Sequence, residues 1–371
     1  MSKSILKLSL LAVTFLFMGA GCVSLSGNSG AGTSGPAGMF ASTDKGETWQ
    51  QITTWPTVEG VKSIAGVNVY RIFEDPQDVD AMYLASRNAG LFYTYDGGRT
   101  WQQEGSPLNT GFVYSVAVHP QNKCLVYATN GRQLFRTDDC SRTWTEMYRE
   151  SRSSVLINSL GFNQFSPYEI YMGQSNGDLL RSYDSGNSWS VSQRFGDRVM
   201  YIVSSPLREN LTYVVTAKKG LFRSEDGGSS WVALSDNLKK FSGSLEYRRH
   251  LLHPTDPDTF YWISTYGILR TQDRGDTWEA YSLIHPPGSA NIYAFAIDPK
   301  DDNNMYYTAT IGARSTFYKS LDGGKNWITK KLPSGQYPVT LLVHPEKTNI
   351  LYLGFTVPPE SKKTTPKLYN D

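Results

Sequence analysis

Seven aspartates recur in one short motif and are the most numerous residues that could act as acids or bind metal. The motif reads Ser/Thr-x-Asp-x-Gly-x-polar-Trp, and its clearest copy runs from Thr94 to Trp101. An Asp accepts hydrogen bonds from backbone N–H groups of a tight turn, and Gly supplies a positive φ. A protein of this kind usually has one catalytic centre, whereas this motif, with its aspartate, occurs seven times. We therefore interpret as structural turn residues Asp44, Asp96, Asp139, Asp184, Asp226, Asp273 and Asp322.

Arginines and tyrosines form the second group of residues that could bind a ligand. A guanidinium fork holds a carboxylate, a sulfate or an acidic peptide through paired hydrogen bonds, and aromatic rings can line such a site. The alternative is that these charged residues only populate solvated loops. The candidate ligand-binding residues are Tyr70, Arg71, Arg87, Arg132, Arg198, Tyr201, Tyr247, Arg248, Arg249, Tyr293 and Arg314.

Carboxylates outside the repeated motif could serve a glycoside hydrolase. Such an enzyme needs two carboxyl groups across a cleft, roughly 5–10 Å apart. Glu246, Asp197 and Glu74 are the candidates if the protein is an enzyme, but the sequence singles out no pair. The histidines lack partners at metal-ligand spacing. We expect no metal and no cofactor.

The spacing of the motif predicts the elements that position these residues. Its tryptophans lie 42 to 52 residues apart, which is the size of one four-stranded propeller blade. Each unit opens with an apolar strand, but the first begins in mid-unit near Met39 and the last ends near Thr356 without a motif. Two strands from each end therefore complete one blade and remove the open sheet edges. The sequence predicts an all-β fold: a single seven-bladed β-propeller over residues 39–356.

The same alternation of strands predicts two rims. The seven motif turns lie on one rim, and the loops that enter the innermost strands lie on the other. Tyr114 falls at a position comparable to Tyr70 and Tyr201 near the central channel. We expect a cationic, aromatic face on the rim away from the motif turns.

The N-terminus reads as an export signal. Residues 1–21 have a basic start and an apolar run, and small residues then lead to Cys22, which resembles the lipobox of bacterial lipoproteins. An ordinary signal peptide is the alternative. Residues 22–38 are Gly/Ser-rich and predict a flexible tether, and residues 357–371 predict a flexible tail. We expect an exported lipoprotein, anchored in the membrane through lipid on Cys22 and facing the periplasm or the cell exterior.

Charge and cysteines add two expectations. The chain has a formal net charge of +2, and removing Lys3 and Lys7 with the signal leaves it near zero, which argues against nucleic acid as a partner.

Cys124 and Cys140 fall on one rim of neighbouring strands, so they could form a disulfide; two free thiols are the alternative. We expect a monomer.

The repeated motif resembles the Asp-box, or bacterial neuraminidase repeat. Asp-boxes occur in sialidases, xyloglucan-type endoglucanases, the sortilin ectodomain and the photosystem II assembly factor family. The resemblance covers residues 39–356 and implies the propeller fold, but these families use similar scaffolds for different functions. The sortilin and assembly-factor families imply peptide or protein partners.

Our leading functional hypothesis is a lipid-anchored, non-enzymatic propeller of the cell envelope, which presents the cationic, aromatic face to a protein or an acidic glycan. The alternative is a glycoside hydrolase of sialidase or xyloglucanase type. The hypothesis predicts that replacing Arg71, Arg248 and Arg249 by Ala weakens binding without changing folding.

Overall fold

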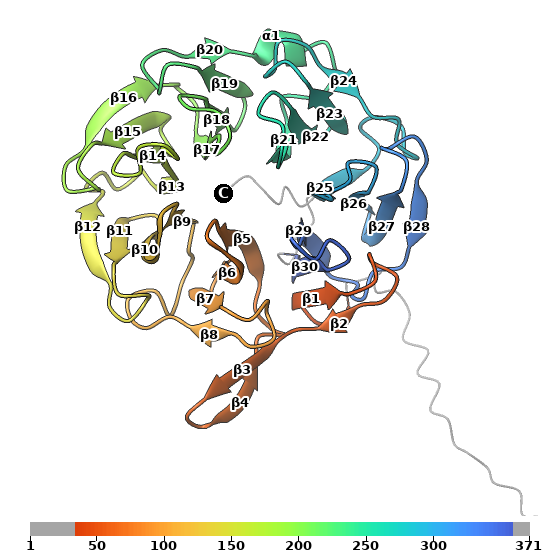
Figure 1. The fold of residues 1–371 in the computed structure, drawn as a ribbon, viewed down its shortest axis with the longest axis horizontal. Helices are drawn as coiled ribbons and strands as arrows, with labels where there is room; N and C mark the ends of the chain where they lie inside the picture. Colours follow the sequence, from red (N-terminus) through yellow and green to blue (C-terminus); the bar gives the residue numbers. More distant parts are fainter. Residues whose placement is uncertain (1–33, 359–371) are drawn as a thin grey trace, which may run out of the picture. The chain divides into compact units, whose positions relative to one another are not determined.

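Seven four-stranded antiparallel sheets surround a central axis in the computed structural model, which describes residues 34–358 (Figure 1). The innermost strands are β5, β9, β13, β17, β21, β25 and β29, one from each blade. Blade 1 comprises β1 (Gly38–Ser42), β2 (Gln50–Gln51), β29 (Tyr337–Val343) and β30 (Leu351–Thr356). Blade 2 comprises β5 (Val69–Asp75), β6 (Asp78–Ser86), β7 (Leu91–Thr94) and β8 (Gln102–Gln103). Blade 3 comprises β9 (Ser115–His119), β10 (Asn122–Thr129), β11 (Gln133–Thr137) and β12 (Thr145–Arg149).

The other four blades repeat this arrangement. Blade 4 comprises β13 (Ile157–Phe162), β14 (Ile170–Gln174), β15 (Asp178–Ser182) and β16 (Ser190–Arg194). Blade 5 comprises β17 (Val199–Ser204), β18 (Thr212–Thr216), β19 (Leu221–Ser224) and β20 (Val232–Ala233), and is followed by α1 (Ser235–Leu238). Blade 6 comprises β21 (Tyr247–Leu252), β22 (Phe260–Ser264), β23 (Ile268–Thr271) and β24 (Glu279–Ala280). Blade 7 comprises β25 (Asn291–Ile297), β26 (Met305–Ile311), β27 (Arg314–Ser320) and β28 (Ile328–Lys330).

Blade 1 joins the two ends of the described chain. Its strand order is β2-β1-β30-β29, and β1 pairs with β30 from Gly38 opposite Phe355 to Ser42 opposite Leu351. This ladder pairs strand edges that would otherwise be open. The predicted seven-bladed propeller, closed by strands from both termini, is confirmed.

Each Asp-box is held by hydrogen bonds within its own turn. Thr94 Oγ1 donates to Asp96 Oδ1 at 2.7 Å and accepts from Gly98 N at 3.0 Å. Asp96 also accepts from Thr100 N at 2.9 Å and from Thr100 Oγ1 at 2.6 Å. Equivalent bonds occur at Asp44, Asp139, Asp184, Asp226, Asp273 and Asp322. The motif residues therefore satisfy one another, and little carboxylate capacity is left for chemistry.

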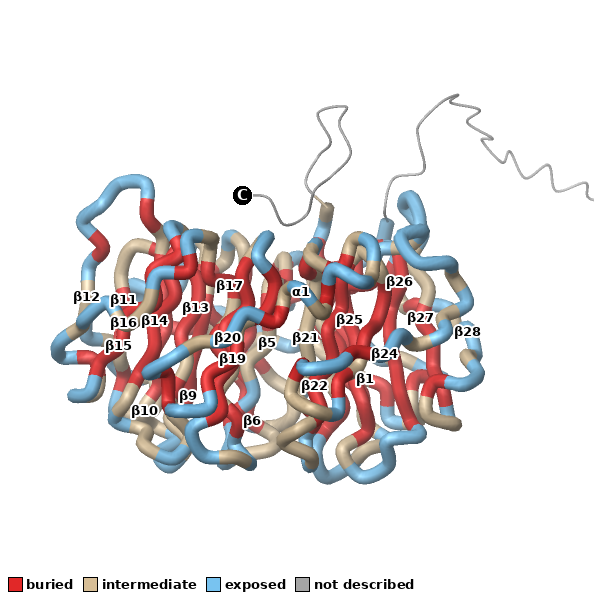
Figure 2. The backbone as a smooth tube through the Cα atoms, turned by 90° about the horizontal axis from the view of Figure 1, so that it is seen from above, coloured by how far each residue is buried: buried red, intermediate tan, exposed pale blue. Residues whose placement is uncertain are grey.

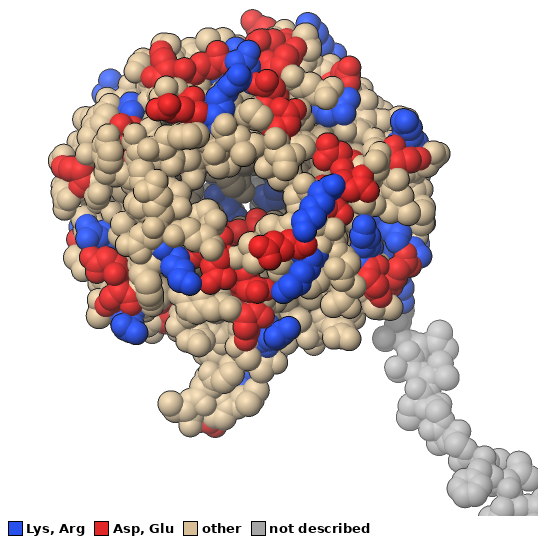
Figure 3. Space-filling view, viewed as in Figure 1, with Lys and Arg blue, Asp and Glu red and all other residues tan. Residues whose placement is uncertain are grey.

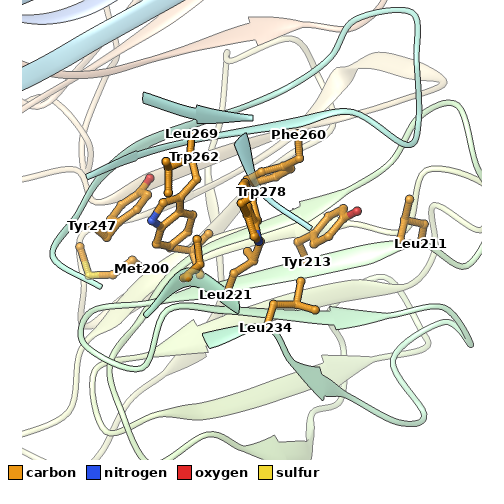
Figure 4. Close-up of a cluster of buried hydrophobic side chains, with 12 residues drawn as sticks. Met200, Leu211, Tyr213, Leu221, Leu234, Tyr247, Phe260, Trp262, Leu269 and Trp278 are labelled. Atoms are coloured by element: carbon orange, nitrogen blue, oxygen red, sulfur yellow. The ribbon is translucent and has the colours of Figure 1, made fainter. Parts of the chain in front are cut away.

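The apolar core lies between neighbouring blades. Figure 2 shows buried residues along the strands and exposed residues at both rims. At the seam of blades 5 and 6, Trp278 packs among Tyr213, Leu221 and Leu234 (Figure 4). Trp101 is fully buried, and its Nε1 donates to Ile52 O at 2.9 Å. The five other Asp-box tryptophans are half-buried, so these rings stabilise their seams by different amounts.

Residues 54–63 form a hairpin that the repeat did not predict. Strands β3 (Thr54–Thr57) and β4 (Gly60–Ser63) pair with each other and stand outside the ring (Figure 1). Trp55 anchors the hairpin by packing edge-to-face on Phe92 at 5.4 Å between ring centroids. Val58 at the tip is fully exposed.

The structure contains a disulfide between Cys124 and Cys140, whose sequence separation is 16 residues. Cys124 lies near the start of β10, and Cys140 occupies the turn of the third Asp-box with φ 59°. Closing a loop of this length contributes about 3 kcal/mol in the chain-entropy model.

Several expectations concern residues outside the described ones. They are the signal over residues 1–21, the lipid on Cys22, most of the tether and the tail from residue 359 onward. In the part of the chain that the structure describes, no helix has the length and apolarity that crossing a membrane requires.

Candidate functional site

The innermost strands begin at the rim opposite the Asp-boxes. Each one leads into a turn on the Asp-box rim, because antiparallel neighbours place every second turn on the same side. Their first residues therefore surround the channel at the opposite rim, which we call the mouth. β1 begins and β30 ends at this rim as well, since β30 runs antiparallel to β29.

A ring of β-bulges shapes the channel below the mouth. In six innermost strands the register shifts by one residue near the strand start. A bulge leaves one residue without ladder partners and redirects the next side chain. The bulged residues are Tyr70, Asn158, Met200, Arg248, Tyr293 and Val339. The residues at which pairing resumes are Arg71, Ser159, Tyr201, Arg249, Ala294 and Thr340.

Arg71 crosses the channel from blade 2. Its Nη2 donates to Met200 O of blade 5 and its Nη1 to Tyr114 O, each at 3.4 Å. The guanidinium lies over the Tyr201 ring at 3.8 Å from the centroid and over Tyr70 at 4.6 Å. Met200 is a bulged residue, so Arg71 satisfies a carbonyl that the ladder has released.

Arg249 makes the corresponding link from blade 6. Its Nε and Nη2 donate to Val339 O, another bulged residue, at 3.2 and 2.5 Å, and its Nη1 donates to Tyr201 Oη at 3.4 Å. His250 packs edge-on against Tyr201 at 4.7 Å, and its Nδ1 lies 2.7 Å from the Tyr247 hydroxyl. Burial, reinforced by the charges of Arg71 and Arg249, lowers the pKa of His250 to about 3. We call Arg71, Tyr201, Arg249 and His250 the neck.

These contacts change one expectation. Replacing Arg71 and Arg249 by Ala would leave bulge carbonyls without partners, and an unsatisfied buried carbonyl costs roughly 1–3 kcal/mol. The triple substitution that includes Arg248 therefore affects folding as well as binding.

Aromatic and cationic side chains meet at the mouth. Tyr70 packs edge-on to Phe112 at 4.6 Å, and Phe112 stacks on Tyr114 at 4.1 Å. Arg87 lies over Tyr70 at 5.3 Å and over Phe112 at 5.8 Å. Burial raises the pKa of Tyr114, and the charges of Arg198 and Arg87 oppose this rise. We call Tyr70, Arg87, Phe112, Tyr114 and Arg198 the mouth cluster. Sequence reasoning did not select Phe112, although it alternates with Tyr114 just before β9.

The remaining candidates have other surroundings. Arg132 Nη1 donates to Arg152 O at 2.6 Å and to Val155 O at 3.0 Å. Tyr293 stacks on Tyr337 at 6.4 Å between ring centroids. Arg314 is exposed at the start of β27.

The candidate catalytic carboxylates lie in separate environments. Glu246 Oε2 lies 3.8 Å from Arg248 Nη2 and accepts from Thr265 Oγ1 at 2.9 Å. Asp197 Oδ2 accepts from the backbone N–H groups of Lys218 and Lys219 at 2.5 and 2.9 Å. Glu74 lies in the channel.

The channel contains a cavity of about 560 Å³ between the neck and the Asp-box rim. Apolar side chains from all seven innermost strands line it, and Glu74 is the one acidic residue among its lining residues. Enclosure by the ring raises the pKa of Glu74 to about 7, although water in the channel reaches its side chain. A carboxyl with this pKa suits a general acid, but the described residues that line the cavity include no second carboxylate to act with it.

No group of three or more His, Cys, Asp or Glu side chains is arranged to hold a metal ion within residues 34–358.

Comparison with known proteins relates the chain to several Asp-box families. The family model described as "Sortilin, neurotensin receptor 3" matches residues 37–171. A probable oligoxyloglucan-reducing end-specific xyloglucanase of Neosartorya fischeri is 25% identical over 306 residues, which are 76% of this chain and 35% of that protein. The photosystem II assembly protein Ycf48 of a Synechococcus strain is 29% identical over 185 residues, which are 48% of this chain and 49% of that protein.

A solved structure of YCF48 bound to D1 peptide has the same fold. Its TM-score is 0.58 at 18% sequence identity, and the match covers 81% of this chain and 94% of that chain. The chain thus spans only about a third to a half of the length of the two curated relatives, but it corresponds to nearly all of this structure. The protein is a seven-bladed Asp-box β-propeller related both to xyloglucanases and to Ycf48 proteins.

Proposed function

We propose that this protein is a non-enzymatic binding or assembly-factor propeller of the cell envelope. It presents the mouth cluster to a partner protein or to an acidic glycan. The observation that carries the proposal is the mouth cluster itself, in which Arg87 and Arg198 accompany three adjoining aromatic rings. Guanidinium groups beside aromatic rings suit acidic segments with apolar or planar neighbours.

Two further observations support a binding role. The YCF48 structure matched here carries a bound D1 peptide, and the likeness covers 94% of its chain. The Asp-box aspartates are occupied by their own turns, and Glu246, Asp197 and Glu74 have different surroundings. Among the described residues, these three candidates therefore do not assemble into the pair of carboxylates that a glycoside hydrolase requires.

A glycoside hydrolase is the alternative, and the relationship to xyloglucanases favours it. The match to the Neosartorya enzyme covers 35% of that protein. A panel of fluorogenic xyloglucan oligosaccharides and sialosides separates the two functions. Turnover that disappears in Glu74→Gln would support the hydrolase, and we expect no turnover.

The mouth cluster is tested by removing its two positive charges. In an Arg87→Gln, Arg198→Gln double variant, binding to immobilised acidic peptides or uronate oligosaccharides should weaken about tenfold or more, because each lost charge-assisted hydrogen bond costs roughly 1.5–3 kcal/mol. Surface plasmon resonance measures the change. The matched control is Arg99→Gln, Arg142→Gln, which removes two exposed charges from Asp-box turns and should change affinity less than about twofold. Equal weakening by both double variants would contradict the proposal.

We also propose that lipid on Cys22 anchors the ring to a membrane. The small residues before Cys22 and the Gly/Ser-rich tether after it support this. In a Cys22→Ala variant the protein should move from the membrane fraction to the soluble fraction, as seen by immunoblotting. Retention in the membrane would contradict the anchor.

A further inference from the structure

The channel is open toward the Asp-box rim. Residues that end the innermost strands at this rim, including Pro76, Pro254 and Pro299, line the cavity together with Arg71 and Arg249. Figure 3 shows the central hollow from one face of the ring, with Lys or Arg atoms at its bottom. A solute can therefore approach the neck from the rim opposite the mouth cluster.

Arg71 is a buried cation without a matching anion. It is 6% exposed, and among the described residues its guanidinium bonds two backbone carbonyls, both at 3.4 Å, and no carboxylate. Its Nε has no hydrogen-bond partner in the part of the chain that the structure describes. Burying an ionised group is costly unless it is paired, and long bonds to neutral carbonyls offset only part of that cost.

Three further residues follow bulges in innermost strands and line the same cavity. Ser159 follows a bulge as Arg71 does and lines the cavity; its Oγ is buried beside Gly173 of β14 and has no hydrogen-bond partner among the described residues. Tyr201 and Arg249 also follow bulges and contact each other there. The neck thus combines two guanidinium groups with the Tyr201 hydroxyl, and none of its four residues is acidic.

We propose that the neck is an oxyanion site reached from the Asp-box rim. Its ligand is free sulfate or phosphate, or the carboxylate of a small organic acid whose body occupies the channel cavity. A guanidinium fork matches the paired oxygens of either class, and such bonds are stronger in an enclosed site. This site goes beyond the proposed function, since it lies inside the ring and not on the mouth.

Substitution of Glu74 gives a second test of the proposal, in which anion binding should become tighter and not weaker. It follows Arg71 by three positions in β5, so it lies about 10 Å nearer the Asp-box rim. Its carboxylate repels an entering anion when ionised, whereas the guanidinium of Arg71 attracts it. Arg71→Met should therefore weaken anion binding, and Glu74→Gln should strengthen it.

The experiment measures the binding of sulfate and of glucuronate to the full chain by isothermal titration calorimetry, with chloride at equal ionic strength as the reference. The wild type should bind at least one of the two oxyanions saturably. Arg71→Met should weaken that binding at least tenfold, Glu74→Gln should tighten it about two- to fivefold, and Arg142→Met, at an Asp-box turn, should leave it unchanged. Circular dichroism of each variant verifies that the ring is folded.

Each result has a defined meaning. Saturable binding of sulfate alone would assign a free inorganic anion, and tighter binding of glucuronate would assign an organic acid. No saturable binding of either anion, or equal affinity in folded Arg71→Met, would overturn the site. Weaker binding in Glu74→Gln would overturn entry past Glu74. None of these outcomes depends on the partner at the mouth, which the Arg87 and Arg198 substitutions test separately.

Discussion

Phe355→Ala should lower the free energy of unfolding by about 3–5 kcal/mol, as for other fully buried phenylalanines. Phe355 lies in β30, is completely buried, and packs edge-on against Phe40 of β1 at 5.4 Å between ring centroids. Its loss creates a cavity where the first and last strands meet. Urea denaturation followed by tryptophan fluorescence measures the change.

A double-mutant cycle can show that this contact closes the ring. Phe40→Ala, Phe355→Ala and the double variant should give a coupling energy of about 0.5–1.5 kcal/mol, the range for edge-to-face aromatic pairs. Phe165→Ala is the matched control, since Phe165 is 45% exposed, and it should cost less than about 0.5 kcal/mol. A coupling energy of zero, or equal losses at Phe355 and Phe165, would argue against closure by β1 and β30.

The sequence was sufficient to predict the ring because the repeated information is local. Each Asp-box turn is specified by a hydroxyl, an aspartate and a glycine within eight residues, as the bonds between Thr94 and Thr100 illustrate. The closure followed from counting strands at the two ends. Both predictions depend on short-range chemistry repeated seven times, and both are confirmed.

The β3–β4 hairpin was missed because it occurs once and breaks the period. Its local signals are present: Trp55 and Val61 favour a strand, and Gly60 follows Glu59 in the turn. Pro56 within the first strand is a signal against a strand, which is tolerated here because the hairpin has no neighbouring strand on its outer edge.

The neck could be predicted only in part. Sequence reasoning selected Arg71, Tyr201 and Arg249 as channel residues, but it did not predict that the two arginines also bond backbone carbonyls of other blades. The bulges that release the carbonyls of Met200 and Val339 have no signature in these strands. Arg71 meets Met200 across the channel, from a strand three blades away, and no local pattern encodes that contact.

The stability of this protein should depend on pH through two carboxyl groups, His250 and the Asp-boxes, which act in different directions. On the alkaline side the causes are Glu104 and Glu74, since burial raises the pKa of Glu104 to about 7 and enclosure by the ring raises that of Glu74 to about 7. A carboxyl with a raised folded-state pKa destabilises the fold as it ionises, so stability is lost as pH rises from about 4.5 to 7. Glu104 is 3% exposed and accepts a hydrogen bond from Trp144 Nε1 at 3.0 Å. Its shift corresponds to about 3 kcal/mol, whereas water in the channel reduces the effect of Glu74.

On the acid side two causes act. Burial, reinforced by the charges of Arg71 and Arg249, lowers the pKa of His250 to about 3, so stability is lost as pH falls from about 6.5 to 3. The second cause is the set of Asp-boxes. Hydrogen bonds, first from the hydroxyl or amide side chain at the seventh motif position, lower the pKa to about 2 in Asp44, Asp139, Asp184, Asp226 and Asp322. A lowered folded-state pKa contributes stability above the unfolded value of 3.8 that is lost as pH falls toward 2. Each box contributes little alone, but the losses occur together around the ring.

The urea midpoint measured from pH 2.5 to 8 tests both limbs of this profile. Glu104→Gln keeps an acceptor for Trp144, and its midpoint should increase relative to that of the wild type as pH rises from 5 to 8. Asp184→Asn should make the decline below pH 4 slightly shallower, because one fewer box is protonated on unfolding. A midpoint that stays constant between pH 4 and 2.5 would show that the aspartates are not bound in their turns. A difference in midpoint between Glu104→Gln and the wild type that stays constant from pH 5 to 8 would show that Glu104 ionises without cost, in a ring more open to water at Trp144 than the structure describes.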